Sequence, residues 1–221
     1  MLITNLLFPE KCVLCGKILG RSELDLCRNC RVDSPECNHH GKKFQFLNTV
    51  TALWYYEGNV RRSLLRFKFY GTRAFARSYG RLLAMKASQQ IPDGYDLITW
   101  VPVSFFRKLK RGYDQVELLG KYVSRETGVD CIKLVKKIRH NRPQSGIQGD
   151  AQRRANVLGA YKVIDPSLVA GKRILLLDDI VTTGATAGEV ARILLTAGAK
   201  EVHLGAVAMA RRNVNKNQVK L

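Results

Sequence analysis

Two adjacent carboxylates and a group of hydroxyl side chains lie together in the C-terminal part of this 221-residue sequence. Asp178 and Asp179 end an apolar run, and a turn of small and hydroxyl residues follows them: Thr182, Thr183, Gly184, Ala185 and Thr186. Carboxylates accept hydrogen bonds from a sugar diol or face a hydrated Mg²⁺ ion. Hydroxyl groups and the N–H groups of a helix N-terminus bind phosphate. One loop could therefore hold a phosphorylated sugar by both ends.

The elements expected around this turn are a buried strand and a helix. The run 173–177 is short and mostly apolar, which favours a strand of a parallel sheet. Apolar residues at helical spacing follow the turn, and Gly198 ends their pattern. Ligands of open α/β sheets bind at the carboxyl ends of strands, so the pattern predicts a ligand site. The alternatives are a plain strand–turn–helix and a Walker B strand, for which the sequence has no G-x-x-x-x-G-K-[ST] partner.

The same stretch closely resembles the motif that binds phosphoribosyl pyrophosphate (PRPP) in type I phosphoribosyltransferases. The resemblance implies that Asp178 and Asp179 hold the ribose hydroxyls as catalytic residues. It also implies that the turn from Thr182 to Thr186 cradles the 5′-phosphate and that Mg²⁺ accompanies PRPP.

Four cysteines near the N-terminus form two C-x₂-C pairs, Cys12 with Cys15 and Cys27 with Cys30. Each pair can chelate one ion from a tight turn, and four thiolates complete a tetrahedron. The pattern predicts a closed structural zinc site rather than disulfides or a redox-active pair. Further thiol and imidazole groups are spare ligands: Cys37, His39 and His40. We expect a zinc-finger head over residues 1–42 and an α/β domain over 43–221.

The composition indicates a globular protein with a polyanionic partner. The formal net charge is +19, and nucleic acid is the first candidate partner, although part of the charge could serve solubility or phosphate substrates. No apolar run is long enough to span a membrane, and the first residues do not resemble a signal peptide. We therefore expect a cytoplasmic protein.

Three other segments carry features of interest. A strand over 95–103 leads into the basic loop of Arg107, Lys110, Arg111 and Gly112, which the type I resemblance assigns to pyrophosphate. The polar stretch 140–156 lacks apolar periodicity and is predicted to be a loop, matching the family's flexible hood. The stretch 60–84 is predicted to be helical with a break near Tyr70. Its basic and aromatic residues suit single-stranded nucleic acid or a solvated face.

The order of these features resembles the ComF/ComFC family of competence and DNA-uptake proteins over most of the chain. The matching residues, apart from those already named, are Gln115 in the basic loop and Gln144, Arg154 and Asn156 in the hood. Asp114 departs from the family's usual Asn and would add a negative charge to the basic loop.

This second resemblance implies a type I phosphoribosyltransferase-like parallel sheet with a zinc head. It also implies a cytoplasmic protein that handles imported single-stranded DNA in natural transformation, with a competence helicase and DNA-processing proteins as possible partners. An active phosphoribosyltransferase and a PRPP-sensing regulator of DNA binding remain the alternatives, because a fold alone does not establish a function.

Overall fold

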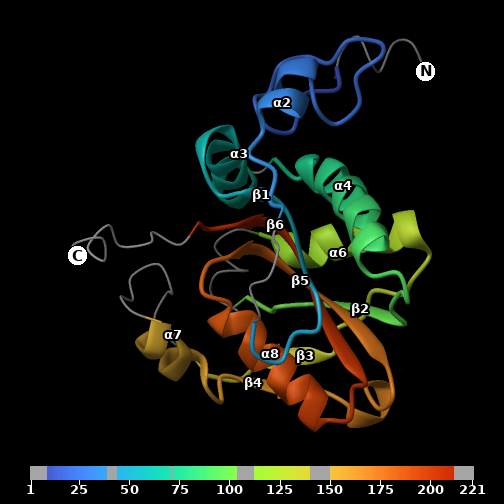
Figure 1. The fold of residues 1–221 in the computed structure, drawn as a ribbon, viewed down its shortest axis with the longest axis vertical. Coiled ribbons are helices and arrows are strands. Elements are labelled where there is room, and N and C mark those ends of the chain that lie inside the picture. Colours follow the sequence, from blue (N-terminus) through green and yellow to red (C-terminus); the bar gives the residue numbers. More distant parts are fainter. Residues whose placement is uncertain (1–8, 39–43, 71, 104–111, 140–149, 212–221) are drawn as a thin grey trace, which may run out of the picture.

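The computed structural model describes residues 9–38, 44–70, 72–103, 112–139 and 150–211 (Figure 1). Its centre is a parallel sheet of four strands in the order β1-β6-β5-β2. The strands are β1 (Val50–Tyr55), β2 (Leu97–Trp100), β5 (Arg173–Val181) and β6 (Glu201–Met209). The predicted parallel α/β sheet is confirmed.

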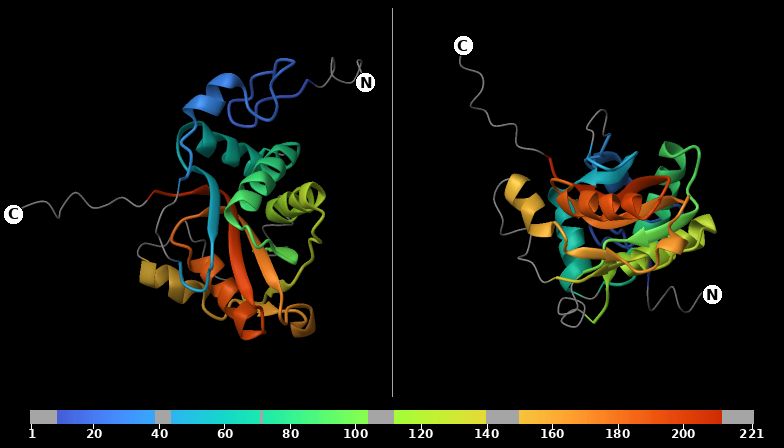
Figure 2. Two further views of the ribbon diagram at one scale, coloured as in Figure 1. Left: turned by 45° about the vertical axis from the view of Figure 1, so that its right-hand side comes forward. Right: turned by 90° about the horizontal axis from the view of Figure 1, so that it is seen from below.

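Helices cover both faces of this sheet (Figure 2). One face packs against α3 (Gly58–Phe69), α4 (Phe75–Gln90) and α6 (Gln115–Thr127), and the other against α8 (Ala185–Thr196). Strand β5 alternates as a doubly covered strand must: Leu175 and Leu177 join the first core, and Ile174 and Leu176 join the second.

Smaller elements extend the second core. An antiparallel pair of strands, β3 (Val135–Lys137) and β4 (Tyr161–Val163), contributes buried residues to the α8 side. The remaining elements are α2 (Arg28–Asp33), α7 (Asp150–Val157) and the 3₁₀ turn η2 (Pro166–Leu168). Within the described residues, no helix is long and apolar enough to cross a membrane.

Two elements differ from the sequence-based expectation. Strand β5 does not end at the acidic pair, because its ladder with β6 continues from Asp178 to Val181. The predicted loop over 140–156 contains α7 in its described part. Among residues 151–157, whose burial is described, only Val157 is buried, and the sequence shows no apolar stripe there. The predicted break near Tyr70 is confirmed, since α3 ends at Phe69.

The N-terminal head packs directly on α3 and α4. Val13 and Leu14 are fully buried and belong to the same apolar core as α3, α4 and α6. The Ser63 hydroxyl donates a hydrogen bond to the Val13 carbonyl, and the Arg66 guanidinium donates one to the Leu14 carbonyl. The head is thus joined to the domain by buried contacts.

Close packing of α4 on α6 generates a first prediction. A Cβ added at Gly80 would lie 2.5 Å from Cβ of Tyr122 and 3.2 Å from the α6 backbone. Gly80→Ala should therefore destabilise the protein by about 1–3 kcal/mol, through overpacking. Urea unfolding measures this loss. Gly20→Ala is the control, since its nearest neighbour is 3.6 Å away, and equal stability of the two variants would contradict the packing described.

Candidate phosphoribosyl-binding site

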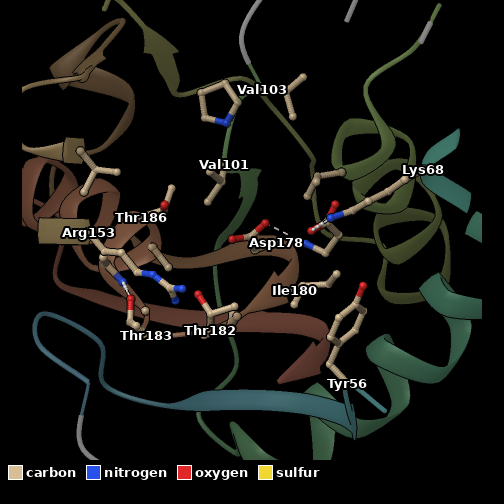
Figure 3. A pocket seen from close by; sticks show the side chains of 18 of the residues that line it. Tyr56, Lys68, Val101, Val103, Arg153, Asp178, Ile180, Thr182, Thr183 and Thr186 are labelled. Atoms are coloured by element: carbon tan, nitrogen blue, oxygen red, sulfur yellow. Dashed lines mark hydrogen bonds and ion pairs between the residues drawn. The ribbon is translucent and has the colours of Figure 1, made fainter. Parts of the chain in front are cut away.

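A cavity of about 600 Å³ lies at the carboxyl edge of the sheet (Figure 3). Residues that follow two strands form part of its wall, namely Tyr56 after β1 and 101–103 after β2. The C-terminal end of β5 and the first turn of α8 form another part, and this part holds the whole predicted PRPP motif: Asp178, Asp179, Thr182, Thr183, Gly184, Ala185 and Thr186. After β2 the chain continues to α6 on one face of the sheet, and after β5 it continues to α8 on the other face. The cavity lies at the carboxyl ends of these two strands, between connections to opposite faces, and ligands of open α/β sheets bind at such positions.

The two carboxylates differ because successive residues of a strand point to opposite faces. Asp179 faces α3, where its Oδ1 lies 2.8 Å from Nζ of Lys68. Asp178 faces the cavity (Figure 3), and its Oδ1 accepts a hydrogen bond of 2.8 Å from the Asp179 N–H. Burial, and then the charge of Asp179, raise the pKa of Asp178 to about 8. Ionisation of Asp178 is therefore disfavoured relative to that of a carboxyl group exposed to water.

The turn before α8 has a shape that only glycine adopts easily. Gly184 has φ +78°, and a Cβ there would lie 2.3 Å from the Phe44 ring. The ring belongs to the segment that follows the head and is itself buried. The hydroxyl of Thr183 accepts the N–H of Ala185 at 3.3 Å. Phe44 thus supports the turn from behind, while the turn's other side lines the cavity.

Among the described residues, three cations line the cavity, and the sequence analysis named none of them as a site residue. Lys68 pairs with the acidic strand, whereas Lys137 and Arg153 come from β3 and α7. Arg153 points into the cavity on the side of Thr182 and Thr183 (Figure 3). Arg154, which the ComF/ComFC resemblance matches to the hood, lines a separate cavity of about 350 Å³ behind the turn. Neighbours on a helix diverge by about 100°, so these arginines face different spaces.

The predicted pyrophosphate loop is only partly visible. Arg107, Lys110 and Arg111 lie outside the described residues, as does Gln144 of the hood. Gly112 is described, has φ +73° and does not line the described wall of the cavity.

Asp114, the residue that departs from the family's usual Asn, has a structural role at the start of α6. Its Oδ1 accepts the N–H groups of Val116 and Glu117 at 3.0 and 3.2 Å, so it caps the N-terminus of α6. Burial raises the pKa of this carboxyl. The sequence did carry a signal for this role, because Asp is a preferred residue immediately before a helix.

The four head cysteines converge as predicted. The Sγ atoms of Cys12, Cys15, Cys27 and Cys30 lie within 4.8 Å of one another, and those of Cys15 and Cys27 are 3.7 Å apart. Tetrahedral zinc with Zn–S bonds of about 2.3 Å requires sulfur separations of about 3.8 Å, so the set fits structural zinc. Cys37 is buried in the α8-side core instead, and His39 and His40 lie outside the described residues.

Two family models match the chain, one over most of the α/β domain and one over the N-terminal head. A model of the phosphoribosyl transferase domain matches residues 77–220. A model of the double zinc ribbon domain matches residues 3–51.

Several curated proteins are similar over most of the chain. Competence protein F of Haemophilus influenzae is 26% identical, over 92% of this chain and 98% of its own length. Competence protein ComFC of Bacillus subtilis is 27% identical, over 85% of this chain and 72% of its own. DNA utilization protein YhgH of Escherichia coli K12 is 27% identical, over 87% of each chain.

Loss of the predicted zinc should destabilise the whole domain, because the head shares a core with α3 and α4. Structural zinc contributes on the order of 10 kcal/mol in zinc-finger peptides. We expect a chelator, or Cys15→Ser, to remove one zinc per chain and to lower the single melting transition. Elemental analysis and calorimetry measure both effects. Cys131→Ala is the control, and a zinc content unchanged by Cys15→Ser would contradict the assignment.

The contact between Gly184 and Phe44 predicts a coupled effect on stability. Gly184→Ala should cost more than the approximately 1–2 kcal/mol of left-handed backbone strain, because the methyl group also meets the ring. In a Phe44→Ala background the same change should cost only the backbone term. A double-mutant cycle by urea unfolding measures the difference. Equal costs in both backgrounds would show that the ring does not support the turn.

Proposed function

This chain belongs to the phosphoribosyl transferase domain family, with competence proteins among its relatives, and from that premise we propose that its cavity binds PRPP. We further propose that the protein handles imported single-stranded DNA in the cytoplasm during natural transformation. The observation that carries the PRPP proposal is the gathering of the whole motif on the wall of one cavity.

The geometry supports one orientation of PRPP. The turn from Thr182 to Thr186 and the start of α8 suit the 5′-phosphate, with Arg153 beside them. Asp178 would then face the ribose hydroxyls and the Mg²⁺ that PRPP carries, while Asp179 keeps its ion pair with Lys68.

The pyrophosphate end of PRPP is assigned from the sequence. Arg107, Lys110 and Arg111 follow the cavity residue Val103 along the chain, and pyrophosphate is the ligand they suit.

The DNA proposal is supported by charge and by relatives. A net charge of +19 favours a polyanion, and the names of the relatives refer to competence and to DNA utilization. A competence helicase and DNA-processing proteins are the partners that fit this role.

A second candidate function is catalysed phosphoribosyl transfer, and the far wall of the cavity favours it. Tyr56, Leu65 and Phe69 form an apolar, partly aromatic surface suited to a planar acceptor base. In such a transfer the bond from ribose C1 to the pyrophosphate oxygen breaks, and pyrophosphate leaves with the electron pair. An acceptor nitrogen forms the new bond to C1. The carboxylates beside the ribose would stabilise the positive charge that develops on it.

Calorimetric and thermal-shift titration with Mg²⁺-PRPP tests the pocket. Ligand at 100 times its Kd stabilises the native state by about 2.7 kcal/mol, which raises Tm by roughly 5–10 °C. Asp178→Asn and Asp179→Asn should abolish this shift and leave the zinc content intact. Asp130→Asn, an exposed carboxyl outside the cavity, is the control. No PRPP binding by the unaltered protein would overturn the proposal.

The raised pKa of Asp178 gives this titration a pH signature. A Mg²⁺ ion placed beside Asp178 would favour its ionised form, so binding should release a proton, and affinity should rise from pH 6 to about 8 and then level off. Calorimetry in two buffers of different ionisation enthalpy counts the proton. In the free protein the raised pKa means that stability falls as pH rises toward 8, and Asp178→Asn should remove that fall. Ligand binding without pH dependence would show that Asp178 does not titrate.

A further inference from the structure

One face of α3 is exposed, basic and aromatic. The helix carries four cations and no acidic residue. Its buried residues, from Val60 to Phe67, lie along one side, and at about 100° per residue the opposite side presents Arg61, Arg62 and Phe69. Tyr70 follows at the C-cap. We name these four residues, Arg61, Arg62, Phe69 and Tyr70, the α3 outer face.

The other cations of α3 already have structural roles. Lys68 pairs with Asp179, and Arg66 donates to the Leu14 carbonyl of the head. Arg61 and Arg62 are exposed, and Arg62 donates to the Asn59 side chain at 2.7 Å. The acidic residue just before the helix, Glu57, pairs with Arg211 at 3.1 Å. The outer face therefore keeps its positive charge.

The aromatic end of the face lies at the mouth of the cavity. Phe69 lines the cavity and is still 60% exposed, and Tyr70 is 76% exposed. From Arg61 to Phe69 the helix rises about 12 Å, so the two arginines lie little more than two turns from the ring. Adjacent aromatic rings with cations along the same path are the features that bind single strands without sequence preference.

We propose that the α3 outer face binds single-stranded DNA, with an unpaired base stacked on Phe69 and Tyr70 and the backbone phosphates on Arg61 and Arg62. This inference rests on the proposed DNA role and names the surface that would bind the strand. Charge favours nucleic acid over a protein partner, because exposed cations flank only two large apolar side chains. It also follows that the strand and PRPP meet at Phe69, which lines the phosphoribosyl cavity.

Fluorescence anisotropy with a labelled mixed-sequence single strand, and with its duplex, tests this surface. Phe69→Ala and Tyr70→Ala should each weaken single-strand binding by about 5- to 150-fold, the range for loss of one stacked base. Duplex binding should change little, because paired bases present no free face to the rings. Leu168→Ala is the control, since Leu168 is 47% exposed and lies in η2, outside the cavity wall.

The cations should produce a different signature. Arg61→Ala and Arg62→Ala should each reduce the slope of log K against log salt by about 0.7, while the aromatic variants leave this slope unchanged. Lys200→Ala, an exposed cation at the opposite edge of the sheet, should change neither affinity nor slope. Melting temperatures of all variants check the fold. PRPP titrations of the variants at Arg61, Arg62 and Tyr70, which do not line the described wall, check that the cavity remains intact.

The outcomes distinguish the α3 outer face as a binding surface from the DNA role of the whole protein. Single-strand binding by the unaltered protein with no loss in Phe69→Ala and Tyr70→Ala would overturn the α3 outer face alone. Absence of any DNA binding would overturn the DNA role itself, whereas PRPP binding is judged independently by its own titration. Equal losses for single strand and duplex would also count against base stacking.

Discussion

The ion pair between Lys68 and Asp179 joins the strand that carries the acidic pair to the helix packed against it, and much of the site depends on that contact. Two carboxylates on consecutive residues repel each other, and one compensating cation on one face breaks their equivalence. Asp179 then faces Lys68, while Asp178 turns to the cavity, where burial and the neighbouring Asp179 carboxylate raise its pKa.

The position of Lys68 is itself fixed from the N-terminal side. The head contacts α3 through Ser63 and Arg66, so the zinc-binding segment and the acidic strand are linked through a single helix. The segment after the head makes a second link, since Phe44 packs behind the glycine of the phosphate turn. These two contacts give the head a physical connection to the cavity, although no head cysteine lines it.

Local patterns predicted the parts of the site that are local in the chain. The strand, the turn of Thr182 to Thr186, the helix after it and the cysteine pairs could all be read from residue types and spacing. Contacts between distant segments could not be predicted from local patterns. They include the ion pair of Lys68 with Asp179 and the packing of Phe44 on Gly184. They also decide that Arg153, and not Arg154, lines the cavity. The helix α7 was missed because packing on its neighbours, rather than an apolar stripe, holds it.

The order of the strands has a consequence for synthesis. Strand β1 pairs with β6, so Val50 finds its partner Leu204 only after most of the chain has emerged from the ribosome. Until then β1 lacks its ladder partner β6, and unpaired strand edges can pair with other chains. The cysteine pairs, in contrast, are close in sequence and can close around a metal while translation continues. In the order of synthesis, the head and α3 therefore precede three of the four strands of the sheet.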